Sequence, residues 1–478
     1  MKPVAGTAFK TAIALAALAL FALSCSSSGD RGGTGSAPTS PPAAAPAPAE
    51  DPASTEAPAP AEETPEAPVP AENEPGGEPE PPPPTVEPSI GVSDSEIVIS
   101  VVRSDTADLQ ERGVIPDVGD PVENFKVFAG LANEAGGAAG REIVVTSHLY
   151  PPGATATAQQ PACLQATEDD EAFIVVFVGG MAAETVLCVT EQHERIAYAL
   201  SGVLTQSVYD RSGGRLFNHA VSANRLMNTW VQVLDDNGIL SGATFGLIRH
   251  DQSDHAEAAD VVRDALAERG YDLIEEIALP CEGTSCGQAG TAIERFQARG
   301  VDHIFSLMGA IQYTTVVSAA EAAGYRPQWL SSDFENQAFD STAAFMRGIS
   351  RNYEGAYGVS ASPLSAAPDA YRSDCNTRFT QVTGIEYEPL VDAWNAVGSM
   401  CYIVDRIVEA ADNAEAAGGL SQSSFIVELE KLTFELGDAR GGWAPGKHDA
   451  TDTYVLKQWS RDCLCWHEIE GSRGILNG

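Results

Sequence analysis

The chain changes character near residue 90, where a proline-rich stretch gives way to alternating strand-like and helix-like patterns. Phe173 to Val178 is continuously apolar, as expected of a parallel strand covered on both faces. Between Ala256 and Arg269 apolar residues recur at helical spacing, and Gly270 follows where glycine commonly ends a helix. Repeated alternation of this kind predicts an α/β fold with parallel sheets.

The alternation occurs in two consecutive sets. The first set runs from a strand at Ile97 to Val102 as far as one at Ile196 to Leu200. The second begins with Thr244 to Ile248 and reaches Trp329-Leu330. Two such sets predict two Rossmann-like lobes. Because ligands of open α/β sheets bind beyond the carboxyl ends of the strands, we expect a binding site between the lobes.

Residues 1–24 have the features of a secretory signal peptide. Lys2 and Lys10 precede an apolar run that ends at Leu23 and is too short to span a bilayer comfortably. Ala22-Leu23-Ser24-Cys25 resembles a bacterial lipobox, whose cysteine receives fatty acyl chains such as palmitate. The sequence therefore predicts a lipoprotein anchored through Cys25 to the outer face of the bacterial cell membrane. An ordinary cleaved signal with a coincidental cysteine is the alternative.

Residues 25–90 form the predicted tether. Eighteen of the 30 prolines fall between Pro38 and Pro88, together with eleven acidic residues and no Lys or Arg. Proline removes backbone donors and like charges repel, so this stretch cannot build a core. We expect an extended spacer that holds a folded part away from the membrane; a tail without a role is the alternative.

Charge and motifs narrow the possible functions. The chain has 478 residues, 67 of them acidic and 28 basic, with a formal net charge of −39. Such an acid excess argues against nucleic-acid binding, which needs a basic surface. The phosphate-loop, H-E-x-x-H and G-x-G-x-x-G motifs are absent. We therefore expect neither an enzyme nor a nucleic-acid-binding protein.

A set of short segments carries a more specific signal through its order and spacing across residues 91 to 470. They are Gly91-Val92-Ser93-Asp94, Asn133 to Arg141, Val178-Gly179-Gly180, Leu200-Ser201-Gly202, His250-Asp251, Ala323 to Pro327 and Tyr353 to Gly358. This part of the chain resembles the type I periplasmic binding proteins of the leucine/isoleucine/valine-binding class, which serve ABC importers.

The resemblance implies two lobes joined by three crossovers, near Phe217 to Ser222, Ser360 to Ser365 and Gly437 to Gly441. Lobe one would comprise residues 91–217 and 365–437, and lobe two residues 218–364 and 438–478. The implied function is capture of a small polar ligand, amino-acid-like or another organic acid or amide, for an ABC permease and its ATPase subunits. We expect a monomer without cofactor or metal. A sensor that reports ligand occupancy to a membrane receptor, or a cell-wall protein with a vestigial cleft, are alternatives.

This lobe division sorts the cysteines. Without Cys25, eight remain, an even number that suits an oxidising compartment. Pairing within lobes leaves a hinge free to move, and in lobe one we favour Cys163–Cys188 and Cys375–Cys401. The four cysteines of lobe two leave the pairing open, since a bridge between neighbouring cysteines would be short; they are Cys281, Cys286, Cys463 and Cys465.

The resemblance also places candidate ligand contacts in the loops after the strands. Thr205 matches a threonine that contacts an amino-acid head group, and Asp333 stands where the family has an acidic residue facing an ammonium; a helix-capping carboxylate is the alternative for Asp333. The other candidates, chosen by position, are Ser104, Asp105, Gly180, Met181, Ala183, Ser201, Asp251, His255 and Gly309.

Three departures point away from branched-chain amino acids. Met181-Ala182-Ala183 offers no hydroxyl where the family offers serine or threonine, and His255 replaces an aromatic wall. The loop after Leu307 lacks the usual aromatic residue. The stretch His250 to His255 also contains two imidazoles and two carboxylates that could hold a metal, but such loop spacing is unselective. We expect a different small ligand and no metal there.

Overall fold

The computed structural model describes residues 89–111, 119–152, 154–200, 202–282, 285–361, 369–386, 391–436 and 439–476. The predicted signal peptide, Cys25, the tether up to residue 88 and Ser201 lie outside the described residues. Among the described helices, none combines the length and apolar character needed to cross a membrane.

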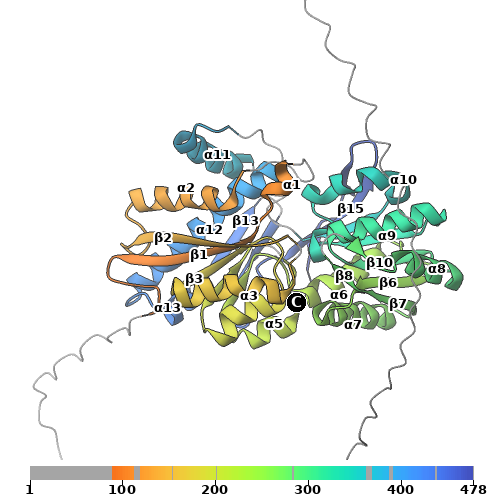
Figure 1. The fold of residues 1–478 in the computed structure, drawn as a ribbon, viewed down its shortest axis with the longest axis horizontal. Coiled ribbons are helices and arrows are strands. Elements are labelled where there is room, and N and C mark those ends of the chain that lie inside the picture. The colour runs from red at the N-terminus through yellow and green to blue at the C-terminus, as the bar shows by residue number, and fades with distance from the viewer. Residues whose placement is uncertain are drawn as a thin grey trace, which may run out of the picture. The chain divides into compact units, whose positions relative to one another are not determined.

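The first part of the fold contains five strands that alternate with helices (Figure 1). Its elements are β1 (Glu96–Ser104), α1 (Ala107–Glu111), α2 (Pro121–Glu134), β2 (Glu142–Tyr150), α3 (Ala156–Leu164), β3 (Ile174–Val178), α4 (Ala183–Leu187), β4 (Ile196–Ala199), α5 (Gln206–Arg211) and β5 (Leu216–Asn218). Three later helices pack on the same part, namely α11 (Asp369–Thr383), α12 (Val391–Ala416) and α13 (Gln422–Leu429).

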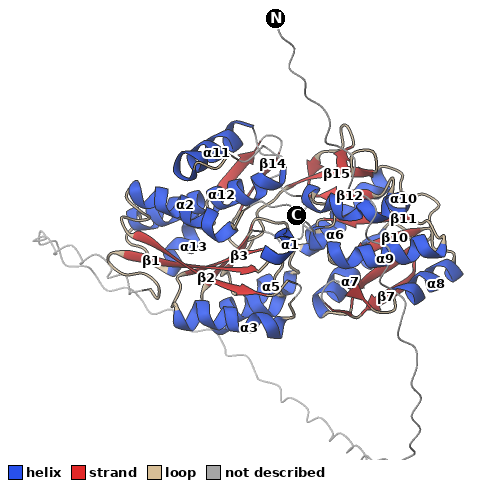
Figure 2. Cartoon of the chain, turned by 45° about the horizontal axis from the view of Figure 1, so that its top comes forward, coloured by secondary structure: helices blue, strands red, loops and turns tan. Residues whose placement is uncertain are grey.

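These five strands form one parallel sheet in the order β2-β1-β3-β4-β5. One face is covered by α2, α12 and α13, and the other by α3, α4 and α5 (Figure 2). Strand β3 therefore has buried side chains on both faces, which explains its uninterrupted apolar run. Local signals agree with this arrangement, because Asp120 caps the first turn of α2 and Pro121 occupies its first position.

The second part repeats the alternation around a larger sheet. Its elements are α6 (Ala223–Asp236), β6 (Phe245–His250), α7 (Ser253–Glu268), β7 (Leu273–Leu279), β8 (Cys281–Glu282), β9 (Ser285–Cys286), α8 (Ala289–Arg299), β10 (His303–Leu307), α9 (Ala310–Ala323), β11 (Gln328–Ser332), α10 (Ser350–Tyr353) and β12 (Tyr357–Ser360), with later strands β15 (Thr453–Ser460), β16 (Cys465–Glu468) and β17 (Gly474–Ile475). Gly300 and Gly324 end α8 and α9 in the left-handed conformation.

The second sheet has the strand order β16-β15-β12-β11-β10-β6-β7. Strands β12 to β7 are parallel, whereas β15 and β16 add an antiparallel edge. Helices α6 and α7 cover one face, and α8 and α9 cover the other. The predicted class, two α/β lobes built on parallel sheets, is therefore confirmed.

Crossovers between the sheets run side by side at one place. The chain leaves the first sheet after Asn218, and it returns to the second sheet through residues 443–452, after the hairpin of β13 (Thr433–Leu436) and β14 (Ala439–Gly442). Asn218 N donates to His448 O at 2.9 Å, and Ala450 N donates to Asn218 O at 2.8 Å. These bonds join the first and third crossovers into a short parallel pair. The residue limits of the two lobes stay a prediction.

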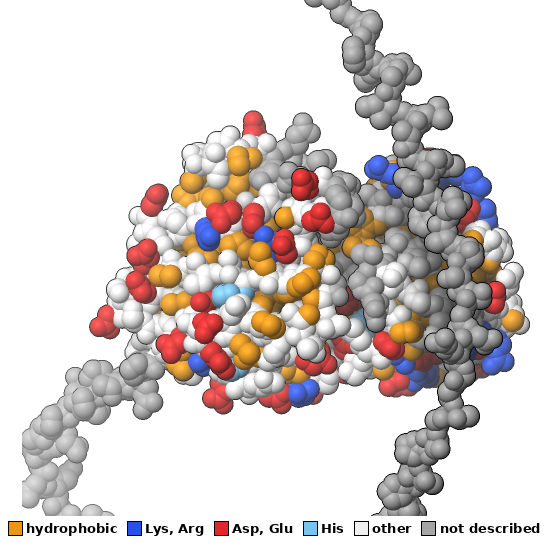
Figure 3. All heavy atoms as spheres, in the orientation of Figure 1, with side chains coloured by type: hydrophobic (Ala, Val, Ile, Leu, Met, Phe, Trp, Pro, Cys, Tyr) orange, Lys and Arg blue, Asp and Glu red, His pale blue; other side chains and the backbone are white. Residues whose placement is uncertain are grey.

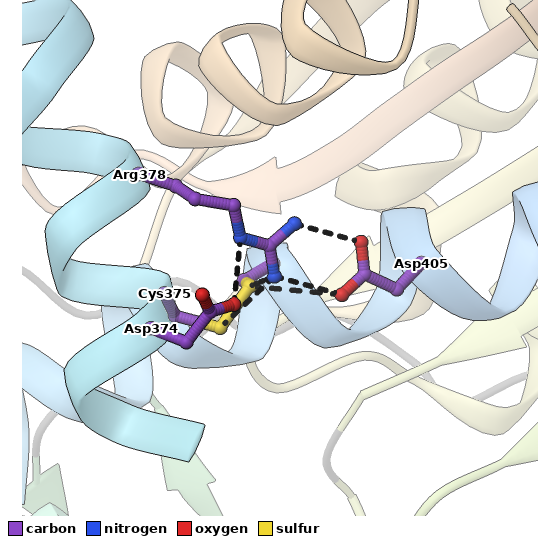
Figure 4. The surroundings of a disulfide bond; sticks show 5 residues. Asp374, Cys375, Arg378 and Asp405 are labelled. Atoms are coloured by element: carbon purple, nitrogen blue, oxygen red, sulfur yellow. Dashed lines mark hydrogen bonds and ion pairs between the residues drawn. A yellow bond between two sulfur atoms is a disulfide. The ribbon is translucent and has the colours of Figure 1, made fainter. Parts of the chain in front are cut away.

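The disulfides confirm the two pairs favoured for lobe one. Cys163 pairs with Cys188, and Cys375 pairs with Cys401. Figure 4 shows that Arg378 of α11 lies against the second pair, with Nη2 2.8 Å from Cys401 Sγ, and donates to both carboxylate oxygens of Asp405 on α12. This disulfide and its ion pair fasten α11 to α12.

In the second part, the pairing of the four cysteines was open from the sequence. In the structure, each disulfide joins two cysteines that are close together in the chain. Cys281 and Cys286 face each other across the β8–β9 hairpin and form one disulfide. Cys463 and Cys465 form the other, across a single intervening residue. Ser285 also belongs to a G-x-S-x-G string, residues 283–287, which the sequence analysis overlooked. It lies in the two-residue strand β9, not at the strand-to-helix turn that a hydrolase nucleophile requires.

The acid excess is visible on the surface. On the face shown in Figure 3, acidic side chains are spread widely over the part that contains the five-stranded sheet, with few basic side chains between them. A dispersed charge of one sign favours solubility and carries no directional preference for a ligand.

Candidate functional site

The loops at the carboxyl ends of β1, β2 and β3 are held together by hydrogen bonds. Tyr150 at the end of β2 accepts from Asp105 N at 2.7 Å through its carbonyl, and its hydroxyl donates to Gly180 O at 2.5 Å. Ser104 ends β1, and its carbonyl accepts from Arg103 Nη1 at 2.9 Å. The structure thus brings the predicted residues Ser104, Asp105 and Gly180 to one edge of the first sheet.

The loops after β3 and β4 meet at the same edge. Met181 is partly exposed, and its terminal methyl lies 3.5 Å from the position that a side chain on Gly202 would occupy. Ala183 begins α4 and is buried. Thr205 precedes α5 and is 1 % exposed, with its hydroxyl 3.1 Å from Ser207 Oγ. Thr205 is therefore covered in this conformation.

A contact between the two parts of the fold lies two residues further along the chain, and no sequence pattern indicated it. Ser207 on α5 donates from its hydroxyl to Glu257 Oε2 at 2.5 Å and from its backbone N–H to Glu257 Oε1 at 3.2 Å. Glu257 lies on α7, which follows β6 of the second sheet. The N-terminal parts of α5 and α7, the helices that follow β4 and β6, are therefore in direct contact at this point.

On the second sheet, the loop after β6 and the loop after β11 form a compact polar cluster around His255. Its Nδ1 lies 2.8 Å from Asp254 Oδ1 and its Nε2 lies 3.9 Å from Glu335 Oε1. The ring is packed edge-on against Phe334 and His250, with ring centroids 5.0 and 4.9 Å apart. The structure thus buries His255 between acidic and aromatic neighbours, and its predicted place in the wall of a ligand pocket stays a prediction.

The contacts within this cluster shift the pKa values of its members. Burial opposes a charge on His255, but the hydrogen bond that its ring donates to Asp254 and the charge of Glu335 outweigh it, so the pKa of His255 is raised. Burial alone would raise the pKa of Asp254, but its hydrogen bond with His255 outweighs burial, so the pKa of Asp254 is lowered. Burial lowers the pKa of His250 to about 4. His255 is consequently the group that favours a positive charge here.

Asp333 is buried and holds the backbone of the neighbouring strand end. Its Oδ2 accepts from Ser360 Oγ at 3.0 Å and from Ala361 N at 2.6 Å. These two residues end β12 and begin the second crossover. The predicted helix-capping alternative is not what this carboxylate does, since its side chain caps no helix. Its role as a ligand contact stays a prediction.

The residues after Asp333 adopt a strained conformation. Glu335 and Asn336 have φ values of 53° and 64°, in a backbone region that residues other than glycine rarely occupy. Two successive residues of this kind turn the chain sharply and set the Glu335 carboxylate beside His255. The side chain of Glu335 remains 39 % exposed, so it can still reach a ligand.

The remaining predicted positions are Gly309 and Asp251. Gly309 is buried before α9, where an added side chain would meet the Gln312 amide at 2.2 Å. Asp251 is exposed after β6, with its N–H donating to Leu279 O at 3.2 Å. The loop after β10 is also held by Gln337, whose side-chain amide donates to Met308 O at 2.6 Å. Gln337 carried no sequence signal, because the bond joins loops of two strands.

Two cavities are lined by described residues. One of about 500 Å³ borders the crossovers and is lined in part by Tyr209, Arg225 and Asp449. Another of about 620 Å³ lies between α2, α11 and α12, beside Arg378 and Asp405. Neither includes a residue predicted from the sequence to contact the ligand.

Two α/β lobes that meet at helices following their strand ends define a hinged binding protein. A family model described as periplasmic binding protein matches residues 111–463, and the chain belongs to this family. The predicted recognition is thereby confirmed, as is the expectation that the chain is not an enzyme.

Solved structures share the fold at low sequence identity. A solute-binding protein of an ABC transporter from Rhodopseudomonas palustris BisB5, in complex with 3,4-dihydroxybenzoic acid, has a TM-score of 0.59 and 13 % identity over 80 % of this chain and 98 % of that chain. A fatty acid ABC transporter substrate-binding protein from Thermomonospora curvata gives 0.59 and 15 %, with 82 % and 93 % coverage. A leucine-, isoleucine-, valine-, threonine- and alanine-binding protein from Brucella ovis, in a closed conformation, gives 0.57 and 17 %, with 80 % and 94 % coverage. A comparison with curated proteins found no match.

Proposed function

We propose that this chain is a lipid-anchored, extracytoplasmic solute-binding protein that delivers a small polar ligand to an ABC importer. The observation that supports the proposal is the contact between Ser207 and Glu257, which joins the helices that follow β4 of one sheet and β6 of the other. A ligand placed between the strand-end loops of the two sheets touches both lobes, so it stabilises the closed arrangement through contacts that the open one lacks. The permease then recognises the closed form.

The chemistry of the loops supports an amino-acid-like ligand or another organic acid or amide. Glu335 offers a partly exposed carboxylate next to His255, and it suits an ammonium or amide N–H of the ligand. On the first sheet, Met181 and Ala183 supply no hydroxyl to grip a carboxylate. A ligand carboxylate would depend there on backbone N–H groups, without the side-chain hydroxyl that the family offers to branched-chain amino acids. The structural relatives named above carry benzoates, fatty acids and amino acids, so the fold leaves the ligand open.

Calorimetry on the oxidised protein tests the ligand class. We would titrate it with leucine, isoleucine, valine, polar amino acids and their amides, and 4-hydroxybenzoate. Binding of a polar amino acid or amide should weaken at least tenfold in Glu335→Gln and stay unchanged in Glu294→Gln, which removes an exposed carboxylate from α8. Tight binding of leucine, isoleucine or valine would contradict the proposed ligand class. No thermal shift with any compound in a wider metabolite panel would contradict ligand capture itself.

Anchoring is tested separately from binding. Labelled palmitate should be incorporated into the wild-type chain, and Cys25→Ser should abolish the label and release the protein from the membrane fraction. An unlabelled wild-type chain would show that the signal is an ordinary cleaved one. Pull-down of permease and ATPase subunits with the ligand-bound protein tests the transport role, whereas recovery of a receptor kinase instead would favour a sensor.

A further inference from the structure

The hairpin of β15 and β16 carries two cysteine sulfur atoms and one histidine ring nitrogen that have no role in the proposed ligand capture. Cys465 and His467 are two residues apart on β16, so their side chains lie on the same face of the strand. Cys463 lies in the turn just before it. The two Sγ atoms and a ring nitrogen of His467 all lie within 4.8 Å of one another. Thiolate and imidazole at this separation are the ligands that zinc prefers.

The cysteines of this cluster are bonded to each other, so a metal can enter only after their disulfide opens. Its position favours opening, because Cys463 and His467 are exposed and Cys465 is partly exposed. Leu464 between the bonded cysteines has φ of 55°, a conformation that is unfavourable for leucine. Opening the disulfide frees Leu464 to leave that conformation.

A second cluster in the same chain provides a natural comparison. Cys163, Cys188 and His193 also place their ligand atoms within 4.8 Å of one another. There both cysteines are fully buried, whereas Cys463 is open to solvent. A reductant in solution therefore reaches the hairpin cluster first.

We propose that Cys463, Cys465 and His467 form a redox-gated binding site for one thiophilic metal ion, with Zn²⁺ as the ion to test. A dithiol reductant supplies two electrons and two protons: its own thiols close to a disulfide while the Cys463–Cys465 bond becomes two thiols. Metal binding then releases both thiol protons, and the two thiolates and the neutral imidazole bind the ion. A water molecule completes the four-coordinate shell that zinc favours.

The experiment uses the whole chain in its native state. The protein is treated briefly with dithiothreitol, which is removed without air, and the free thiols are trapped and mapped. Cys463 and Cys465 should be labelled first. Zinc is then offered in competition with a chromogenic chelator. The reduced chain should bind one equivalent of Zn²⁺, and the untreated chain should bind none at this site.

Variants separate the site from general thiol chemistry. Cys463→Ser combined with Cys465→Ser should abolish the zinc equivalent, and His467→Gln should weaken it at least tenfold. His193→Gln, at the buried cluster, should leave it unchanged. The proposal fails if another disulfide opens first, if the reduced chain binds no more zinc than the oxidised one, or if the double variant keeps the full equivalent.

Discussion

His219 makes the stability of this protein depend on pH. It follows β5 at the first crossover, is 1 % exposed, and is surrounded by the rings of Tyr198, Tyr402 and Trp443. The Tyr198 hydroxyl lies 2.7 Å from its Nε2. Burial and, to a smaller extent, the charge of Arg406 lower the pKa of His219 to about 3. The folded protein therefore keeps this imidazole neutral.

The sign and size of the effect follow from proton linkage. In the unfolded chain the imidazole has its usual pKa of 6.5, so below that pH the unfolded state binds a proton that the folded state refuses. Stability contributed by the neutral His219 is present above about pH 6.5 and is lost as the pH falls toward about 3. Each pKa unit corresponds to about 1.4 kcal/mol, so acidification from about pH 7 to about pH 5 should remove about 2 kcal/mol.

Replacing His219 by Gln keeps a hydrogen-bonding group and removes the titration. The free energy of unfolding is measured by denaturant titration at both pH values for the wild type, for His219→Gln and for His467→Gln as an exposed control. His250, whose pKa is lowered to about 4, contributes in the same direction to all three proteins and cancels in the comparison. The reasoning is refuted if the pH-dependent losses of wild type and His219→Gln differ by less than about 0.5 kcal/mol.

Three further predictions concern closure and stability. Ser207→Ala removes a hydroxyl that donates to Glu257, so the closed population should fall about threefold, measured by energy transfer between dyes on the two lobes; unchanged transfer would contradict a role in closure. Cys375→Ser opens the bridge to Cys401, which spans 26 residues, and should lower the free energy of unfolding by about 3 kcal/mol in denaturant titration; a loss near zero would place the stabilisation elsewhere. Trp230→Ala empties a fully buried position and should lower the free energy of unfolding by about 4 kcal/mol in denaturant titration. A loss under about 1 kcal/mol would show that the surrounding side chains fill the cavity without penalty.

Much of the architecture was predictable because its signals are local. The apolar run of β3 predicted a doubly covered strand, and Gly300 and Gly324 marked the ends of two helices. The order and spacing of short segments indicated the family to which the chain belongs. Cysteine spacing could not resolve the pairing in the second part, because the β8–β9 hairpin that sets Cys281 opposite Cys286 has no strong pattern of its own.

The site was less predictable because its contacts join residues that are distant in the chain. Ser207 and Glu257 are 50 residues apart and meet only when both lobes are placed. Asp333 is committed to Ser360 and Ala361 because β11 and β12 are neighbours in the sheet, which its own loop does not reveal. Glu335 was not among the predicted contacts, because only the turn after Asp333 sets its carboxylate next to His255.

The paired crossovers at Asn218 limit how the protein can move. Two backbone segments that share hydrogen bonds bend together, since bending one alone would break its bonds to His448 and Ala450. The indole N–H of Trp443 also donates to Asn218 O, at 3.1 Å. The first and third crossovers therefore act as a single paired connection between the two sheets.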